Sequence, residues 1–342
     1  MSAQRRPIAI TQGDPAGIGG EIIVLCFGRD PAATAGCFVA GELAHLRRAC
    51  AAVAGGEPPL PIAVIDSPAE AWEVPPRCIP LLPVAPPVEP LVDWGQVDAR
   101  GGRIAAAAVR WAAQAALRGE VVAMVTAPLH KEALAAAGEP FPGHTELLQA
   151  EAAAHLGRTT PEVPVRMMLA NDELRTVLVS IHVSLREAIA AVTVENVLQT
   201  LRITHSALQR LLGRRPVIGV AGLNPHAGEG GLFGREEAEA IRPAIEAARR
   251  EGIDASGPHA PDTVFMRARR GEFDVVAAMY HDQGLIPVKY LGLEQGVNVT
   301  LGLPFVRTSP DHGTAFDIAG SGRADPSSLL AALRMARRLA GG

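Results

Sequence analysis

Three histidines at the ends of apolar, strand-like runs are the first residues of this sequence that could do chemistry. His182, His226 and His281 each stand at or just after such a run and are far apart along the chain. Imidazole nitrogen binds zinc and related metals, and a catalytic metal site keeps three protein ligands and one open position. Each histidine alone is more simply explained as a hydrogen-bonded core or loop residue. Their shared placement favours a metal site, formed above one sheet edge or across two chains.

Two aspartates are candidates to support these histidines. Asp282 follows His281 directly, and Asp262 lies in the segment PDTVF. Metal-bound histidines usually donate their second N–H to a carboxylate or carbonyl, so either aspartate could serve in that way or orient a substrate. The alternative for both is a turn or a helix cap, which PDT before an apolar run resembles.

Five further residues are of types that hold anions. GHTE (143–146) opens a helical stretch, where free N–H groups, the Thr145 hydroxyl and His144 could receive an anion, although a simple helix cap is the alternative. Lys289, Asn298 and Arg307 recur at nine-residue intervals in the apolar stretch 288–307. Unpaired cations are costly to bury, so these residues indicate a bound phosphate or carboxylate, with a solvated face as the alternative.

A glycine-dense segment, NPHAGEGGLFGREE (224–237), also has the character of a site. Glycine permits close approach of the backbone to a ligand, and Asn224, His226 and Glu229 add polar groups to the segment. A long flexible loop is the alternative. The segment is not a Walker loop, and no GxGxxG follows a strand anywhere in the chain, so a Rossmann domain is not supported.

The elements that must position these residues alternate between strands and helices. Strands are predicted at 7–11, 121–126, 175–183, 216–224 and 273–281, and helices from about 18 and at 103–118, 133–158, 193–213 and 235–252. This alternation predicts βαβ units and a largely parallel sheet, with ligands beyond the carboxyl ends of the strands. Residues 75–90 contain seven prolines and are predicted to form an irregular surface connection.

Length, net charge and cysteine content exclude several classes of protein. The chain has 342 residues and a net charge of −4, so two lobes are expected and no basic surplus indicates nucleic acid or an anionic membrane as a partner. Four scattered cysteines without a CxxC pair are typical of a reducing compartment, and we expect them to pack in the core. Neither an export signal nor a membrane-spanning run is apparent, which predicts a cytoplasmic protein.

Two motifs resemble those of the isocitrate/isopropylmalate dehydrogenase superfamily. GDPAGIGGE (13–21) is similar to its GDGIGPE motif, and DHGTAFDIAGSGRADP (311–326) is similar to its adenosine-binding loop. The whole chain further resembles the 4-hydroxythreonine-4-phosphate dehydrogenase (PdxA) family, through TQGDPAGIG, TAPLHK, FPGHTELL, SIHVSL, NPHAGEGGLFGREE, GPHAPDTVF, YHDQGLIPVKYLG and GVNVTLGLPFVRTSPDHGTA. Gly20 stands where the superfamily motif has proline, and region 50–95 matches poorly.

The resemblance implies an α/β fold of two α/β/α lobes with a cleft between them. It implies a cofactor-side lobe of residues 1–128 and 300–342, and a lobe of residues 129–299 for substrate, metal and dimerisation. The implied metal ligands are His182, His226 and His281, and Asp262 and Asp282 support them. The implied substrate residues are His144, Thr145, Lys289, Asn298 and Arg307. The implied cofactor residues are Gly13, Asp14, Asp311, His312, Gly313, Thr314 and Asp317.

The reaction implied by the resemblance is oxidation of 4-phosphooxy-threonine with NAD or NADP and a divalent metal (zinc, magnesium or cobalt). The 3-keto acid then loses carbon dioxide to give 3-amino-2-oxopropyl phosphate, in vitamin B6 synthesis. Lys289, Asp282 and metal-bound water stay open as the proton acceptor. The resemblance also implies a homodimer that shares its active sites.

Three other functions stay open beside this one. Two of them are activities of paralogues, which act on a threonate phosphate or on an aromatic cis-dihydrodiol. The third is a phosphate acyltransferase with the same fold, which would need neither the histidines nor the adenosine loop.

Overall fold

The computed structural model describes residues 5–292 and 295–341, and expectations that include residues 1–4, 293–294 or 342 lie outside it at those positions. Its contacts divide the chain into two compact units, one from the residues up to Pro164 together with Leu303–Ala340, and one from Val165–Gly302. The division differs from the predicted boundary at residue 128. Residues 129–164 belong to the first unit because α5 (Lys131–Ala136) and α6 (His144–Leu156) pack on α4 (Ala99–Leu117).

The sheet of the first unit is parallel throughout. Its strands lie in the order β3 (Ile62–Val64), β4 (Ile79–Pro83), β2 (Cys37–Gly41), β1 (Ile8–Thr11), β5 (Ala123–Thr126) and β12 (Val306–Pro310). The inner strands are nearly continuous apolar runs that are fully buried, as a parallel sheet covered on both faces requires. This organisation confirms the predicted α/β class.

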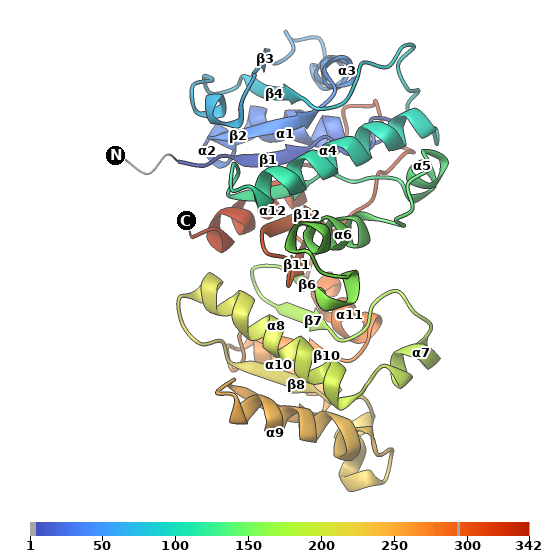
Figure 1. Cartoon of the computed structure of the whole chain (residues 1–342), viewed down its shortest axis with the longest axis vertical. Coiled ribbons are helices and arrows are strands. Elements are labelled where there is room, and N and C mark those ends of the chain that lie inside the picture. The colour runs from blue at the N-terminus through green and yellow to red at the C-terminus, as the bar shows by residue number, and fades with distance from the viewer. Residues whose placement is uncertain (1–4, 293–294, 342) are drawn as a thin grey trace. The chain divides into compact units, whose positions relative to one another are not determined.

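Helices cover both faces of this sheet (Figure 1). In the view of Figure 1, α4 crosses in front of β1, with α5 and α6 beside it, and α1 (Gly19–Arg29) lies behind. α3 (Leu43–Val53) and α12 (Ser327–Leu339) pack on α1. The remaining short helices are α2 (Pro31–Thr34), η1 (Pro68–Trp72) and η2 (Thr160–Glu162). The predicted helix at 133–158 is therefore two helices, because the chain turns between Ala136 and His144.

The second unit has a mixed sheet. Its strands lie in the order β11 (Val297–Leu301), β6 (Arg166–Ala170), β7 (Arg175–Leu178), β10 (Val275–Ala278), β8 (Ile218–Ala221) and β9 (Ala255–His259). β7, β10, β8 and β9 are parallel, whereas β6 is antiparallel to both of its neighbours. The parallel strands place the carboxyl ends of β7, β10 and β8 at one edge.

Helices also cover both faces of the second sheet. α8 (Val194–Leu212) and α9 (Arg242–Arg250) lie in front of it in Figure 1, and α10 (Pro261–Arg269) lies behind. α11 (His281–Tyr290) packs on β7 and β10, and its Leu285 and Val288 join Leu178 and Val276 in one buried cluster. The shorter elements are α7 (Leu185–Ala190), η3 (Pro225–Gly231) and the π-helical η4 (Glu237–Ile241).

The prediction for residues 75–90 was wrong in part, because β4 is a buried strand within them. Ile79 N–H faces β3, where it donates to Pro61, and Val84 N–H faces β2, where it donates to Gly41. By alternation, the nitrogen of Pro80 faces β2, whose pairing with β4 begins only at Leu81. The nitrogen of Pro83 faces β3, whose pairing has already ended. Each proline thus stands where no ladder hydrogen bond is needed, which local proline density could not reveal.

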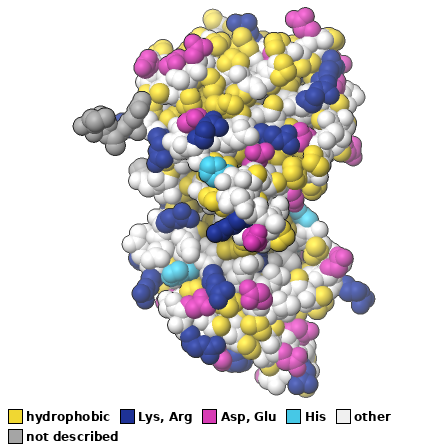
Figure 2. Space-filling model, viewed as in Figure 1, with side chains coloured by type: hydrophobic (Ala, Val, Ile, Leu, Met, Phe, Trp, Pro, Cys, Tyr) yellow, Lys and Arg dark blue, Asp and Glu magenta, His cyan; other side chains and the backbone are white. Residues whose placement is uncertain are grey.

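The surface mixes charges of both signs. Figure 2 shows Lys and Arg side chains interspersed with Asp and Glu over the visible face. Cys26, Cys37 and Cys50 are buried and Cys78 is half-buried, all as free thiols, which agrees with the predicted packing role. Within residues 5–292 and 295–341, none of the helices has the length and apolar character needed to cross a membrane.

Candidate functional site

Three neighbouring parallel strands of the first unit end at one edge of the sheet. Thr11 at the end of β1 pairs with Thr126 at the end of β5, and Thr308 of β12 pairs with Val125. The loops that follow these strands carry the motifs GDPAGIG, APLHK and DHGTA. Parallel pairing therefore gathers three motifs that lie far apart in the sequence.

The loop after β1 holds a buried carboxylate. Gly13 has a positive φ of 74°, and a Cβ there would lie 2.3 Å from the Pro128 carbonyl oxygen, so only glycine fits. Asp14 N–H donates to the same oxygen at 2.9 Å, and Asp14 Oδ1 accepts from Ala16 N–H at 2.9 Å. Asp14 is 1% exposed, and its Oδ2 has no hydrogen-bond partner among the described residues. Burial raises the pKa of this carboxyl to about 6.

Residues of the other two loops pack beside this carboxylate. Ile18 N–H donates to the buried Thr314 carbonyl at 3.0 Å, which joins the β1 loop to the β12 loop. His130 stacks on Phe316 with ring centroids 4.7 Å apart, and its buried Nδ1 has no partner in the described part of the chain. His130 also lies near enough to Asp14 to lower the pKa of that carboxyl. Of the predicted cofactor residues, Gly13, Asp14 and Thr314 thus lie on two joined loops.

The remaining predicted cofactor residues lie further along the β12 loop. Asp311 and His312 are half-buried, and Gly313 and Asp317 are exposed. His312 Nδ1 contacts the Gly313 carbonyl, and its buried Nε2 has no partner among the residues described. Buried polar atoms without partners indicate a missing ligand or water, and several of them gather in these loops.

A buried cation lies at the same sheet edge. Arg307 is 3% exposed, and its Nε and Nη2 donate to Thr126 Oγ1 at 3.2 and 2.7 Å. Burial lowers the pKa of Arg307 to about 10, so the guanidinium stays charged at neutral pH. Burial, and then the charge of Arg307, hold the pKa of His144 well below its usual range. A neutral imidazole and a fixed guanidinium are complementary to an oxyanion.

Helix α6 presents His144 and Thr145 at its first turn, as predicted. The residue before the helix is Gly143, and no side chain caps the helix end, so the simple cap does not form. His144 Nε2 is buried and lacks a partner within the described residues. The first turn of this thirteen-residue helix therefore combines free N–H groups with an unpartnered ring nitrogen, which suits an anion.

In the second unit, two of the three predicted metal histidines lie together. His182 follows the end of β7, and His281 begins α11 directly after β10. Their ring centroids are 5.7 Å apart. His281 Nδ1 contacts Asp282 Oδ1 at 2.7 Å, the arrangement expected for a histidine whose other nitrogen binds a metal.

The third histidine does not join this pair. His226 lies in η3, and its ring faces Phe233 at a centroid distance of 6.3 Å. No group of three His, Cys, Asp or Glu side chains among the described residues stands where it could hold one ion. Within the described residues of one chain, the imidazoles of His182 and His281 lie together with the carboxylate of Asp282, but a third histidine does not lie beside them.

The other predicted residues of the second unit lie on separate elements. Lys289 is in α11 and Asn298 in β11, both half-buried. Asp262 is exposed near the start of α10, where no side chain caps the helix. The nine-residue spacing of Lys289, Asn298 and Arg307 thus corresponds to three different elements, and Arg307 belongs to the first unit.

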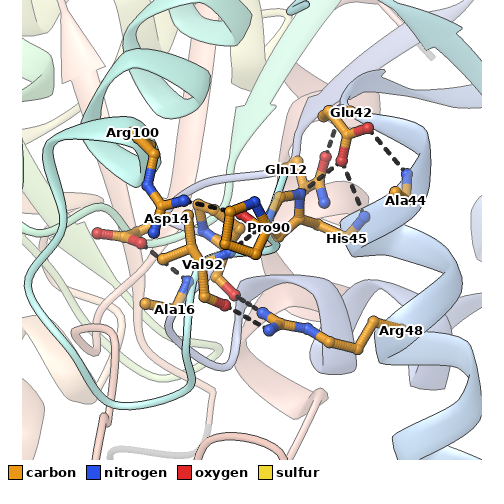
Figure 3. Close-up of polar contacts among 11 residues, drawn as sticks. Gln12, Asp14, Ala16, Glu42, Ala44, His45, Arg48, Pro90, Val92 and Arg100 are labelled. Atoms are coloured by element: carbon orange, nitrogen blue, oxygen red, sulfur yellow. Dashed lines mark hydrogen bonds and ion pairs between the residues drawn. The ribbon is translucent and has the colours of Figure 1, made fainter. Parts of the chain in front are cut away.

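Sequence reasoning missed a network that supports the β1 loop, drawn in Figure 3. Gln12 Oε1 accepts from Glu42 N–H at 2.6 Å, and Glu42 caps α3. His45 Nδ1 contacts Glu42 at 2.5 Å, and its Nε2 accepts from Val92 N–H at 3.0 Å. Arg48 donates to the carbonyls of Val92 and Pro15.

This network ties the proline-rich connection to the loop that carries Asp14. It joins residues from three distant segments, so local patterns could not indicate it. Thr126 and His130 were also missed as individual residues, although TAPLHK had been noted as a strand-end motif.

The fold and these residues define an α/β protein that gathers a buried cation and buried polar groups at the ends of its strands. Comparison with known proteins identifies the family within this class. Residues 33–336 match the family model described as pyridoxal phosphate biosynthetic protein PdxA, and the chain belongs to this family.

Individual relatives agree with this assignment. The chain is 51% identical to 4-hydroxythreonine-4-phosphate dehydrogenase of Beijerinckia indica, covering 97% of this chain and 95% of the relative. It is 44% identical to D-threonate 4-phosphate dehydrogenase of Salmonella typhimurium, covering 98% of this chain and all (100%) of the relative. The crystal structure of 4-hydroxythreonine-4-phosphate dehydrogenase from Klebsiella pneumoniae superposes with a TM-score of 0.87 at 41% identity, covering 98% and 99% of the two chains.

Proposed function

We propose that this chain oxidises 4-phosphooxy-threonine with a nicotinamide cofactor, after which the 3-keto acid loses carbon dioxide to give 3-amino-2-oxopropyl phosphate. The family description names pyridoxal phosphate biosynthesis, which supports a place for this product in that synthesis. The observation that carries the proposal is the buried Arg307 beside His144, an anion-binding arrangement in a member of a dehydrogenase family. The phosphate supplies remote binding energy that aligns the carbinol carbon with the nicotinamide.

The substrate residues of this proposal are the five named from the sequence. Arg307 grips an oxyanion with two N–H groups, and Thr126 fixes the guanidinium plane. His144 and Thr145 add donors from the first turn of α6, and Lys289 and Asn298 complete the set. Lys289 and Asp282 are the candidates in this chain for accepting the hydroxyl proton.

The cofactor residues of the proposal are Gly13, Asp14, Asp311, His312, Gly313, Thr314 and Asp317. The unpartnered Asp14 Oδ2 is an acceptor suited to a hydroxyl or amide of NAD or NADP. His130 and Phe316 form a stacked aromatic pair beside it. The choice between NAD and NADP is made by comparing KM for the two cofactors.

A divalent metal ion is part of the proposal, with zinc, magnesium and cobalt as the candidates. His182, His281 and Asp282 fit such an ion in donor type, and His226 would be the third ligand. Bound there, the ion would lower the pKa of the substrate hydroxyl and stabilise negative charge on oxygen. Asp262 would support the site from α10.

We propose a homodimer, in which a second copy of the chain supplies the third histidine of the ligand set. Support comes from large apolar side chains exposed on the second unit, on and around α7, η3 and α11. They are Val183, Leu185, Ile189, Leu232, Phe233, Ile286 and Tyr290. An apolar surface of this kind on a monomer marks an interaction site, and twofold pairing is the commonest closed symmetry. We place the enzyme in the cytoplasm, where its four free thiols stay reduced.

The alternative substrate is D-threonate 4-phosphate, because a relative of that name is 44% identical. A cis-dihydrodiol of an aromatic acid offers Arg307 a carboxylate but no phosphate, and the neighbour that acts on terephthalate 1,2-cis-dihydrodiol is only 30% identical. The identity of 51% to the named 4-hydroxythreonine-4-phosphate dehydrogenase favours the main proposal over this activity and over an acyltransferase.

The deciding experiment measures NADH formation from 4-phosphooxy-threonine, D-threonate 4-phosphate and unphosphorylated 4-hydroxythreonine, with and without a chelator. We expect the first to have the highest kcat/KM and the chelator to abolish activity. A higher kcat/KM for D-threonate 4-phosphate would overturn the assignment.

A further inference from the structure

The segment that carries His226 has an unusual backbone. Five consecutive residues, 226–230, have positive φ values of 52°, 54°, 81°, 41° and 68°. Three of the five are not glycine, and L-residues are disfavoured in this left-handed region. Strained conformations of this kind persist only where surrounding structure holds them, and they cluster at functional sites. The structure must therefore contain a group that holds this segment.

Glu236 and Glu237 both accept a hydrogen bond from Asn224 at the start of the segment, and Glu237 is the buried one of the two. It is 3% exposed and is the first residue of η4, a π-helix, an element that is rare outside functional sites. Its Oε1 accepts from Leu223 and Asn224 N–H, both at 2.7 Å, and its Oε2 accepts from Asn224 Nδ2 at 2.9 Å. One buried carboxylate thus fixes the backbone entering the left-handed turn.

The same carboxylate also lies against the middle of the turn. A Cβ on Gly228 would stand 2.7 Å from Glu237 Oε2, so the turn approaches Glu237 as closely as glycine permits. A Cβ on Gly222 would stand 3.2 Å from Oε1 and 2.9 Å from the Ala227 side chain. His226 itself is exposed, whereas Glu237 is buried. Glu237 thus supports the turn from within the second unit and leaves the His226 ring accessible.

We propose that Glu237 is a positioning residue, which holds residues 226–230 in the left-handed conformation and thereby fixes His226 for ligand binding. The inference rests on the proposed role of His226 as a metal ligand. Glu237 touches neither substrate nor ion in this account. It acts by fixing the orientation of His226. Groups that contact a metal ligand from behind set the orientation of that ligand and thereby the affinity for the metal.

Two matched pairs of variants test the proposal in the full-length enzyme. Glu237→Gln keeps the shape of the side chain but turns an N–H donor toward Asn224 Nδ2. Its control is Glu239→Gln, because Glu239 is an exposed residue of the same helix paired only with Arg235 among the described contacts. Gly228→Ala brings a methyl group against Glu237 Oε2, whereas Gly230→Ala has a similar positive φ and no neighbour within 4 Å.

Two measurements are made on all four variants: hydrogen exchange of the peptide covering residues 222–233, and zinc affinity by calorimetry. We expect Glu237→Gln and Gly228→Ala to exchange about tenfold faster or more in this peptide and to bind zinc about 10- to 100-fold more weakly. Glu239→Gln should resemble the wild type in both measurements. Gly230→Ala carries a similar positive-φ strain without the contact with Glu237, so it should change both measurements less than Gly228→Ala does. Exchange elsewhere in the chain should stay unchanged.

The outcomes separate this inference from the proposed function. Unchanged exchange in both Glu237→Gln and Gly228→Ala would overturn the inference, as would faster exchange with unchanged zinc affinity. If the active wild-type enzyme binds no zinc, cobalt or magnesium, the proposed metal site fails. Exchange of the 222–233 peptide then decides alone whether Glu237 holds the turn. If Glu237→Gln does not fold, the Gly228→Ala and Gly230→Ala pair supplies both measurements.

Discussion

At the scale of single residues, buried polar groups are what identify the site. Arg307 and His144 were predicted from their motifs. Arg307 is a buried cation, and the half-buried His144 has a buried Nε2 without a partner among the described residues. Thr126 could not be predicted as the partner of Arg307, because the contact depends on the pairing of β5 with β12, 181 residues apart. The sequence therefore predicted which residues belong to the site, whereas their hydrogen-bond partners depend on which strands pair and in which register.

The geometry of Arg307 predicts that lysine cannot replace it. Lysine lacks the planar pair of donors that Thr126 orients, so Arg307→Lys should raise KM for the phosphorylated substrate by about 10- to 100-fold. We expect kcat to fall as well, because remote binding aligns the carbinol. Steady-state kinetics with the exposed Arg323→Lys as the control measure this. An unchanged KM in a folded Arg307→Ala variant would show that Arg307 does not bind substrate.

Asp14 predicts a dependence of stability on pH. Burial raises the pKa of its carboxyl from 3.8 to about 6, so between these values the unfolded chain has lost a proton that the folded chain keeps. The contribution of Asp14 therefore becomes destabilising as pH rises through this window and stays so above it. Relative to wild type, Asp14→Asn should gain roughly 2 kcal/mol in unfolding free energy between pH 4 and pH 8.

Urea unfolding of both proteins at the two pH values measures this gain, with the exposed Asp317→Asn as the control. A difference between Asp14→Asn and wild type that does not change with pH would contradict the shifted pKa. The same variant should bind NAD more weakly if Asp14 contacts the cofactor.

At the scale of elements, each of the five predicted strands corresponds to an observed strand, namely β1, β5, β7, β8 and β10, whereas the other strands were not predicted. Two of the differences have clear physical reasons. β7 ends at Leu178, so His182 lies in a loop four residues beyond the strand rather than within the predicted run 175–183. β4 was missed because the nitrogen of each of its prolines faces the neighbouring strand with which that proline is not paired. Such features depend on where a neighbouring strand begins and ends, which the sequence of one element does not contain.

Close packing between helices makes a prediction about glycine. Gly102 lies within α4, where a Cβ would stand 2.0 Å from the Ala133 carbonyl oxygen at the start of α5. Gly102→Ala must separate two backbones, so we expect a loss of roughly 1–3 kcal/mol or more. Gly28, in α1, has only Leu60 Cδ1 within reach, at 3.5 Å.

Gly28→Ala is therefore the matched control, and it should stabilise the protein by about 0.5–1 kcal/mol because alanine favours a helix. Denaturant unfolding of the two variants gives both values. The packing argument fails if the two substitutions change stability in the same direction.

At the scale of the whole molecule, the question is how many chains build one active site. The sequence left open whether the three histidines meet in one chain or across two. Within the described chain, the His182 and His281 rings lie 5.7 Å apart, and His226 stands elsewhere, on a strained segment beside the exposed Leu232 and Phe233. Local patterns could locate each histidine but not this grouping, which arises from the neighbouring positions of β7 and β10 in the sheet.

This grouping predicts which inactive variants restore one another. We expect each of His182→Ala, His226→Ala and His281→Ala to be inactive alone. If His226 comes from a second copy, a mixed dimer of His226→Ala and His281→Ala carries both lesions in one site and none in the other. It should recover about half of the wild-type activity, because a twofold dimer has two equivalent sites.

A mixed dimer of His182→Ala and His281→Ala should recover nothing, since each site then lacks one member of the adjacent pair. Two different affinity tags isolate the mixed dimers, and NADH formation measures their activity. Recovery by the second combination, or failure of the first with mixed dimers present, would show that the histidines are shared in another way. Because both combinations contain His281→Ala, the contrast depends only on whether the other lesion lies beside His281 or on the η3 segment.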